Sequence, residues 1–314
     1  MTRPAPPERP KTKVVVIGNF DGVHRGHRDL LSHAVADATA HGGEAVVLTF
    51  HPHPAVVLGR SLPPVLTPLA RKVSLLTALG ARVHVEPFDL AFASLSPEAF
   101  CTSLLRSQLD ASQVYVGYNF RFGKGRAGDL TTLSALGDQL GFSVAVHARV
   151  GDAQGPWSST RAREAIARGD VAEATLVLER PHALTGVVQH GRALGRTLGF
   201  PTANLGAVEE MLPANGVYAV NVDALDASGV PAVLGGGVMN VGTRPTVTGG
   251  AAERLAEVHI LTGAHDLYGR ILRVHLADHL REERKFVGID ELRAQIAKDR
   301  DDAERRLGAT PRAP

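Results

Sequence analysis

The sequence predicts a two-domain α/β protein, in which a doubly wound parallel sheet is followed by an antiparallel β-barrel with a terminal helix. Three observations lead to this expectation. The length of 314 residues is enough for about two domains of ordinary size. As far as residue 150, short apolar segments alternate with helix-length segments, which is typical of parallel βαβ units. After about residue 181, strand-like segments follow one another across glycine and proline turns, which is typical of a barrel.

The first part begins with the apolar run Val14–Ile17, whose β-branched residues favour a strand buried on both faces. A helix with one apolar face starts at Arg25 and ends at the glycine pair 42–43. Residues 45–50 form a second buried strand. By the same criteria we expect strands at 82–85, 113–116 and 143–146, and helices at about 68–80, 97–109 and 129–140.

The second part contains short strand-like runs without helix-length gaps between them. They lie near 184–190, 217–223, 231–241, 255–261 and 270–276. A final helix is expected at 289–307, because apolar residues at 292, 296, 303 and 307 share one face. These changes of pattern predict a disordered lead-in at 1–13, a first domain at 14–181 and a second domain at 182–314.

Composition excludes several classes of protein. The 34 basic and 32 acidic side chains leave a formal charge of +2, which gives no indication of a nucleic-acid or membrane-surface partner. The single cysteine, Cys101, excludes a disulfide framework, and no apolar run approaches the ~18 residues of a membrane span. The first residues contain no secretory signal, so we expect a cytoplasmic protein. The sequence leaves open whether it forms a homo-oligomer.

The turn after the first strand, Gly18–His27, carries the most informative residues. α/β domains bind ligands at the carboxyl ends of their strands, and the start of a helix offers free N–H groups to an anion. Gly22 removes a side chain where a nucleotide would come close. His24 and His27 are three residues apart, so both imidazoles project from one face and can stabilise charge at a phosphoryl group.

This histidine pair has two other interpretations, namely a zinc site or side chains satisfied within a loop. Zinc needs about three protein ligands, and only His51 and His53 offer nearby partners. The order of strand, glycines, His-x-Gly-His and helix favours phosphate binding.

A second phosphate motif is predicted at Ser158–Arg163. The hydroxyl pair Ser159-Thr160 at a helix start, with Arg163 one turn further on, can clamp a triphosphate. For the hydroxyl pair alone, the alternative is an ordinary helix N-cap. Gly18–His27 resembles the His-x-Gly-His signature of nucleotidylyltransferases, whose fold is a doubly wound sheet, and Ser158–Arg163 resembles the second phosphate motif of that superfamily.

Other motifs resemble one particular family. Residues 49–54 and 116–123 resemble the FMN adenylyltransferase module of the prokaryotic bifunctional riboflavin kinase/FAD synthetases. Residues 191–204 resemble the riboflavin kinase phosphate loop, with the sequence Gly-Phe-Pro-Thr-Ala-Asn at its end. Further kinase motifs follow in the family's order at 216–219, 240–246, 257–259, 266–269 and 280–286. The resemblance implies an adenylyltransferase domain at 14–181 and a kinase domain at 182–314.

The resemblance also implies the substrates and the roles of residues. The substrates are small molecules, with ATP as co-substrate, FMN and FAD as product or substrate, and Mg²⁺ as the cofactor. For Asn119 and Phe120, core packing and a turn are the alternative to flavin binding. The implied roles are catalysis for His24, His27 and Glu257; ATP or phosphate binding for Gly18, Phe20, Asp21, Gly22, Ser159, Thr160, Arg163, Gly195, Arg196, Gly199 and Pro201; flavin binding for Asn119, Phe120 and Arg281; and metal binding for Thr202 and Asn204.

The two reactions differ in their need for a base. The phosphate of FMN is already ionised near neutral pH, since its second pKa is about 6, so adenylyl transfer needs no general base. The primary alcohol of riboflavin is not ionised, so the kinase step needs a carboxylate, which by resemblance is Glu257.

Two positions depart from the family pattern. Ala162 stands where the family usually has isoleucine, and Glu179 replaces the glycine of Leu-Gly-Arg. The sequence has two rival interpretations: an adenylyltransferase for another substrate fused to an unrelated barrel, and a non-catalytic flavin-binding protein. The Gly-Phe-Pro-Thr-Ala-Asn loop argues against the first rival, and the intact set of functional residues argues against the second.

Overall fold

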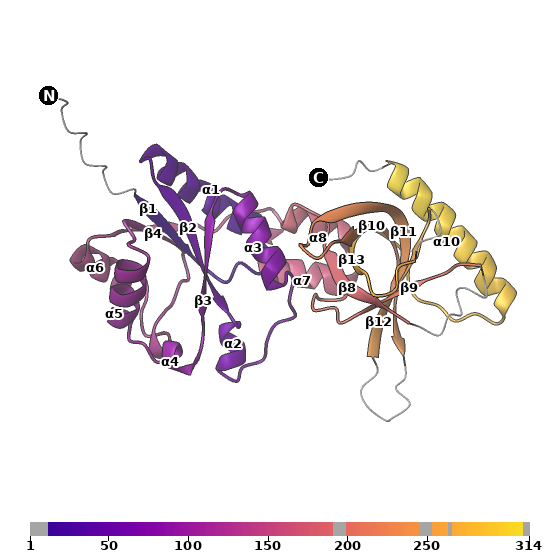
Figure 1. The fold of residues 1–314 in the computed structure, drawn as a ribbon, viewed down its shortest axis with the longest axis horizontal. Helices are drawn as coiled ribbons and strands as arrows, with labels where there is room; N and C mark the ends of the chain where they lie inside the picture. Colours follow the sequence, from indigo (N-terminus) through magenta and orange to yellow (C-terminus); the bar gives the residue numbers. More distant parts are fainter. Residues whose placement is uncertain (1–11, 191–198, 245–252, 263–265, 310–314) are drawn as a thin grey trace. The chain divides into compact units, whose positions relative to one another are not determined.

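The structure is a computed structural model that describes residues 12–190, 199–244, 253–262 and 266–309. The chain forms two compact units (Figure 1). The first unit contains Met1–Pro63 and Leu69–Trp157, and the second contains Pro64–Pro68 and Ser158–Pro314.

The first unit is built on a five-stranded parallel sheet in the order β3-β2-β1-β4-β5. Its strands are β1 (Lys13–Ile17), β2 (Glu44–His51), β3 (Arg82–Pro87), β4 (Gln113–Gly117) and β5 (Ser143–His147). Its helices are α1 (Arg25–Ala40), α2 (Pro54–Val57), α3 (Leu69–Ala78), α4 (Leu90–Ala93), α5 (Pro97–Ala99), the π-helix η1 (Phe100–Gln108), the 3₁₀-helix η2 (Lys124–Arg126) and α6 (Leu130–Leu140), and a small hairpin pairs β6 (Gly151–Asp152) with β7 (Gly155–Pro156).

The sheet is covered by helices on both faces, because β1 is apolar on both faces. Val14 and Val16 pack into a cluster that includes the buried residues of α1, and Val15 and Ile17 pack into a second cluster with η1 and α6. All three valines of this strand are fully buried. This arrangement confirms the doubly wound sheet predicted for the first part of the chain.

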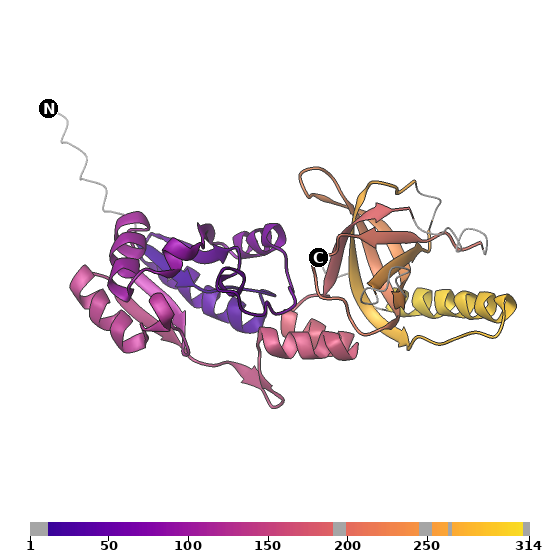
Figure 2. The same ribbon diagram turned by 90° about the horizontal axis from the view of Figure 1, so that it is seen from below.

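The second unit is a closed barrel in the order β10-β11-β12-β9-β8-β13. Figure 2 shows the long helix α10 running along the outside of the barrel, where it packs on β10, β11 and β13. The strands are β8 (Ala183–Gln189), β9 (Ala203–Gly206), β10 (Gly216–Leu225), β11 (Pro231–Arg244), β12 (Glu253–Ile260) and β13 (Ile271–Arg281), and the helices are α7 (Ser159–Arg168), α8 (Val171–Leu178) and α10 (Ile289–Ala309). The antiparallel barrel and its terminal helix are therefore confirmed.

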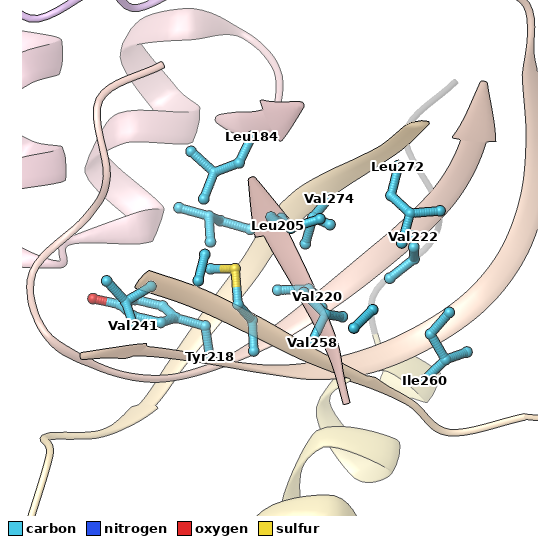
Figure 3. Close-up of a cluster of buried hydrophobic side chains, with 14 of the residues drawn as sticks. Leu184, Leu205, Tyr218, Val220, Val222, Val241, Val258, Ile260, Leu272 and Val274 are labelled. Carbon is cyan, nitrogen blue, oxygen red and sulfur yellow. The ribbon is translucent and has the colours of Figure 1, made fainter. Parts of the chain in front are cut away.

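The barrel core is made by alternate residues of its six strands. Figure 3 shows these side chains pointing toward one another in the interior. Because successive side chains of a strand point to opposite faces, the residues between them lie on the outer surface of the barrel. On β12, for example, Ala256 and Val258 are buried, whereas Glu257 between them is only half-buried.

The helices α7 and α8 belong to the same compact unit as the barrel. Val171 at the start of α8 is part of the barrel core, and the backbone N–H of Ala214 donates to the carbonyl oxygen of Ile166 on α7 at 3.1 Å. Val65 also forms a bridge to Glu210. The compact unit thus includes residues that come before the domain boundary predicted at 181/182. The boundary between the two functional domains stays a prediction.

Most of the predicted elements are present with small shifts of their ends. The strand β9 and the hairpin of β6 and β7 were not predicted. Of the predicted lead-in, residues 1–11 lie outside the described part of the chain, and β1 begins at Lys13.

The departure at Glu179 has a backbone explanation. Glu179 ends α8 in the left-handed region, at φ 55° and ψ 23°. This conformation costs a residue with a side chain about 1–2 kcal/mol, and glycine adopts it without that cost. The glycine of the family pattern therefore matches the conformation, and glutamate at this position carries strain.

We expect Glu179→Gly to raise the free energy of unfolding by about 0.5–1 kcal/mol, because the relief of strain exceeds the extra entropy of an unfolded glycine. The measurement is the urea midpoint of a fragment of residues 158–314, followed by the fluorescence of Tyr218 and Tyr268, since Trp157 and the other two tyrosines lie in the first unit. The control is Glu164→Gly, at an exposed helical position of α7, which should lower stability by about 1 kcal/mol. A lower stability for Glu179→Gly would contradict the strain.

A fragment of residues 158–314 should be more stable than one of residues 184–314, because only the longer one buries Val171 in the barrel core. Burial of a valine side chain is worth about 1.5–3 kcal/mol. Both fragments lack Pro64–Pro68, so their comparison reports on residues 158–183, which contain α7, α8, His182 and the first residue of β8. Equal urea midpoints for the two fragments would show that the helices do not support the barrel.

Candidate functional site

The first candidate site lies where the order of the parallel sheet reverses. β1 pairs with β2 on one side and with β4 on the other, so the chain leaves β1 and β4 at adjacent positions of the same edge. Open α/β sheets bind ligands at this switch point. The turn Gly18–His24 follows β1, and Asn119 and Phe120 follow β4. The topology therefore brings the predicted phosphate turn and the predicted flavin residues to one edge.

The turn after β1 is tight and uses left-handed backbone conformations. Gly22 has φ 85°, and Phe20 and Val23 also have positive φ values, of 50° and 40°. The side chains of Phe20 and Val23 are buried in the core below the turn, which holds these two residues in place. A Cβ atom at Gly18 would lie 3.1 Å from the ring of Phe20, so a side chain is disfavoured there.

The two histidines stack on each other at the start of α1. His24 is the N-cap residue, and its Nδ1 accepts a hydrogen bond from the backbone N–H of His27 at 3.3 Å. The two imidazole rings are 3.6 Å apart between centroids, at an angle of 21°. Phe20 packs on His27 with a centroid distance of 5.0 Å. His24 and His27 are thus fixed side by side at the positive end of the helix dipole, where an anion is favoured.

Gly26 lets the histidines and the neighbouring chain come close together. A Cβ atom at this position would lie 3.0 Å from the carbonyl oxygen of Trp157 and 3.3 Å from the ring of His24. The glycine of His-x-Gly-His therefore has a packing role beside the catalytic one proposed for the histidines.

The surroundings of His53 give no support to the zinc interpretation of the histidine pair. The Nδ1 of His53 accepts from the backbone N–H of Ala55 at 3.1 Å, and its Nε2 contacts the amide of Asn19 at 3.3 Å. Both ring nitrogens of His53 are therefore engaged. Within the described residues, His24 and His27 do not form a metal-ligand group with His51 or His53.

Lys72 joins this site, and the sequence analysis missed it. Its ammonium group, on α3, donates to the carbonyl oxygen of Asn19 at 3.0 Å. Burial lowers the pKa of Lys72, and the carboxylate of Asp21 opposes this shift by favouring the charged form. The half-buried ammonium group of Lys72 adds positive charge beside the phosphate turn, where an anionic ligand would bind. Its hydrogen bond to Asn19 also connects the turn to α3.

Asn119 and Phe120 have different surroundings after β4. Asn119 is exposed, whereas Phe120 is half-buried and stacks on Phe122 at 5.5 Å between centroids, with an angle of 13° between the rings. The ring of Phe120 is therefore used in part for packing on Phe122. A role of Asn119 and Phe120 in flavin binding stays a prediction.

The second phosphate motif opens α7, and the N-cap alternative for Ser159 and Thr160 is wrong. Ser158 is the N-cap, and its hydroxyl accepts from the backbone N–H of Arg161 at 3.2 Å. Ser159 and Thr160 therefore occupy the first helical turn rather than the cap. Arg163 donates from Nε to the carbonyl oxygen of Pro64 at 2.8 Å. These motif residues belong to the second compact unit, and the histidine pair belongs to the first.

A second candidate site lies on the outer face of the barrel. Glu257 on β12 is directly opposite Asn204 on β9 and Asn240 on β11. Residues that face each other across antiparallel strands have Cβ atoms about 4.5–5.5 Å apart. The predicted base and the predicted metal ligand are therefore neighbours in a row of polar side chains. Because Glu257 and Asn204 are 53 positions apart in the sequence, the sequence pattern does not predict that they are neighbours.

The segment before β9 is held against the same face. His259 donates through Nδ1 to the carbonyl oxygen of Pro201 at 2.9 Å, and its ring packs edge-on against Phe200 at 5.6 Å. His259 lies two residues beyond Glu257, so both are on the outer face. Gly199 has φ 85°. Gly195 and Arg196 of the predicted phosphate loop lie outside the described residues.

Thr202 and Asn204 fit a magnesium ion by the nature of their donors. Asn204 is opposite Glu257, and Thr202 lies two residues before Asn204, directly before the first residue of β9. Their hydroxyl and amide oxygens are the hard ligands that magnesium prefers together with substrate phosphates.

Arg281 is strongly bound to another side chain. Its Nε and terminal nitrogen donate to the carboxylate of Asp299 on α10, at 2.9 Å and 2.7 Å, and Asp299 is buried. This pair joins the end of β13 to the terminal helix. Flavin binding by Arg281, as the resemblance implies, would use a guanidinium that Asp299 already orients.

The fold and these sites define a class of protein. One unit carries a phosphate turn at the switch point of a doubly wound sheet, and the other carries a carboxylate–amide row on a closed barrel. The chain is a two-domain nucleotide-dependent transferase. In the described residues, no helix has both the length and the apolar character that a membrane crossing needs.

Comparison with known proteins places it more narrowly. The FAD synthetase family model matches residues 6–161, and the riboflavin kinase family model matches residues 178–307. The bifunctional riboflavin kinase/FMN adenylyltransferase of Escherichia coli K12 is 40% identical over 95% of this chain and 93% of its own. The Bacillus subtilis protein of the same description is 36% identical, with the same coverage. The chain belongs to the bifunctional riboflavin kinase/FMN adenylyltransferase family.

A solved structure shares the whole fold. It is described as a macrolide-efflux protein from Streptococcus pneumoniae, is 31% identical, and covers 94% of this chain and 95% of that chain with a TM-score of 0.82. The description belongs to the Streptococcus pneumoniae protein. The comparison shows that this chain has a similar fold.

Proposed function

We propose that the chain makes FAD from riboflavin in two steps, each carried by its own set of residues. It phosphorylates riboflavin to FMN with ATP, and it then adenylylates FMN to FAD with release of pyrophosphate. The pairing of Glu257 with Asn204 in the barrel supports the assignment of the kinase site, and it is independent of the histidine pair in the other unit. Each unit is also matched by a separate family model.

In the kinase step, Glu257 acts as the general base. The primary alcohol of riboflavin attacks the γ-phosphorus of ATP, a new P–O bond forms, and the bond to ADP breaks. The carboxylate of Glu257 takes the alcohol proton, which the alcohol cannot lose unaided at neutral pH. Its half-buried position between Asn204 and Asn240 holds it on the outer face, where the substrate can reach it.

Thr202 and Asn204 hold Mg²⁺ in this proposal. When bound, the ion would neutralise the phosphate charge of ATP. The loop residues Gly195, Arg196, Gly199 and Pro201 bind the phosphates, and the contact between His259 and Pro201 keeps the end of this loop against β12. Arg281 helps to bind the flavin, in the orientation that Asp299 sets.

In the adenylyl-transfer step, the ionised phosphate of FMN attacks the α-phosphorus of ATP. A P–O bond forms, and the bond to pyrophosphate breaks, with no proton to remove. His24 and His27 donate hydrogen bonds to the oxygens on which negative charge develops. Lys72 and the residues Gly18, Phe20, Asp21 and Gly22 shape the phosphate turn, Ser159, Thr160 and Arg163 bind the phosphates of ATP, and Asn119 and Phe120 contact the flavin.

The proposal has further parts that follow from this chemistry. The partners are small molecules, and no nucleic acid or membrane takes part. The reactions take place in the cytoplasm, where ATP is available, and the adenylyltransferase and kinase domains divide at about residues 181–182. A homo-oligomer is compatible with the proposal but is not needed for either reaction.

Replacing His27 should abolish FAD formation and leave FMN formation intact. The loss of one hydrogen-bond donor to the transition state typically costs a factor of about 10²–10³ in rate. His27→Ala removes the donor, and the two activities are measured separately by chromatography of flavins. His41→Ala, at the exposed C-cap position of α1, is the control and should form FAD normally. FAD formation at the wild-type rate in His27→Ala would show that the imidazole is structural.

Glu257→Gln should lower FMN production by about 10²–10⁴-fold, because the amide keeps the shape of the side chain but cannot accept a proton. Binding of ATP and magnesium should persist, since Thr202 and Asn204 are unchanged. When the variant is supplied with FMN, it should form FAD at nearly the normal rate.

The second activity of this variant is an internal control for folding. Normal riboflavin phosphorylation would assign the base to another residue. Loss of both activities together would point to a structural effect of the substitution and against a role confined to the kinase step.

A further inference from the structure

A group of metal-ligating side chains lies on α1 and β5, and neither reaction uses it. Asp29 and His33 are four residues apart on α1, so they are neighbours on one face of the helix. His147 is the last residue of β5. One ligand atom from each of these three residues lies within 4.8 Å of the ligand atoms of the other two. The fold thus brings two imidazoles and one carboxylate to one place.

Hydrogen bonds within this group already orient its side chains as metal ligands usually are. The carboxylate of Asp29 is 2.7 Å from Nε2 of His147, which joins two segments separated by 118 positions in the sequence. The Nδ1 of His33 donates to the backbone carbonyl oxygen of Asp29 at 2.8 Å. Histidines that bind metals usually make such a contact with the other ring nitrogen, which fixes the ring. The same Nδ1 is 3.9 Å from the carboxylate of Asp29, so either Nδ1 or, after rotation of the ring, Nε2 of His33 can bind an ion.

The group is also accessible and close to the required size. The exposed fractions of the side chains are 60% for His33, 38% for Asp29 and 13% for His147, so a dissolved ion can reach them. Zinc lies about 2.0–2.1 Å from its ligands, which places two ligands about 3.4 Å apart. Closing the group to this size requires a rotation of His33, the most exposed of the three, while the other two are already in contact.

We propose that Asp29, His33 and His147 bind a divalent transition-metal ion of the type of Zn²⁺ or Co²⁺, with water in the remaining positions. Imidazole ligands favour such ions, whereas magnesium prefers sites made of oxygen atoms. The ion would replace the hydrogen bond between Asp29 and His147 and join α1 to the end of β5. This proposal is independent of the two reactions assigned above, and its test does not need them.

The same helix provides a matched control pair. The Nδ1 of His41 contacts the backbone carbonyl oxygen of Asp37 at 2.8 Å, so this pair repeats the spacing and the contact of Asp29 and His33. The carboxylate of Asp37, however, is hydrogen-bonded to Gln113 at 3.3 Å and to the hydroxyl of Tyr115, and among the described residues no histidine completes this pair as His147 completes the other. The Asp37–His41 pair should therefore bind an ion much more weakly.

The test is a titration of the full chain with Co²⁺, without an affinity tag, after removal of metals with a chelator and with excess Mg²⁺ present. The visible d–d absorption of bound Co²⁺ is measured, and Zn²⁺ is then added as a competitor. We expect about one equivalent of Co²⁺ to bind and to be displaced by Zn²⁺. The variants His33→Ala and His147→Ala should each weaken binding at least about tenfold, whereas His41→Ala should bind like the wild type.

A conservative variant separates ligation from folding. Asp29→Asn can still accept a hydrogen bond from His147, so its melting temperature without metal should stay close to that of the wild type, yet its affinity for Co²⁺ should fall. Absence of a bound equivalent in the wild type would show that Asp29 and His147 form an ion pair only. Equal binding by the wild type and by His33→Ala would place the ion elsewhere. Either result would overturn the proposal.

Discussion

The burial of β1 on both faces is the constraint on which the first unit depends. Its residues alternate between two core clusters, and both clusters need helices to cover them. A strand with no exposed face can carry no polar group that contacts a ligand, so the first position available for chemistry comes directly after Ile17. Since β1 is also the strand from which the sheet grows in both directions, that position is the switch point. The burial of the four apolar residues Val14–Ile17 therefore determines the position of the turn that contains His24 and His27.

In the barrel, functional side chains are placed relative to the core in a different way. Its strands are apolar on the inner face and polar on the outer face, so functional side chains can lie within the strands themselves. Glu257, Asn204 and Asn240 are placed by register, that is, by which residues of neighbouring strands face each other. A shift of β12 by one residue would turn Glu257 into the core and expose Val258. The packing of Val258 in the interior therefore also fixes the position of the proposed base.

The sequence predicted the fold well because apolar periodicity decides the burial of strands and helices. It also predicted the turn of His24 and His27, since these residues are neighbours along the chain. Contacts between distant segments were not predictable in this way. Lys72 is an isolated lysine on a helix, and only the packing of α3 brings it to Asn19. The short strand β9 was missed because its four residues lie within a phosphate-loop motif, and its pairing depends on the barrel around it.

The place of α7 has a consequence for the evolution of the chain by recombination. The FAD synthetase family model extends to residue 161, and the main segment of the barrel's compact unit begins at Ser158, so the two divisions overlap at the start of α7. Ser159, Thr160 and Arg163 are therefore inherited together with the barrel whenever the compact unit is exchanged as a whole. A chimera of two family members, joined at the compact boundary, would combine the histidine turn of one parent with the hydroxyl–arginine motif of the other. Exchange of the barrel would then also exchange residues proposed to bind ATP for the other reaction, so the two activities of such a chimera would not be inherited independently.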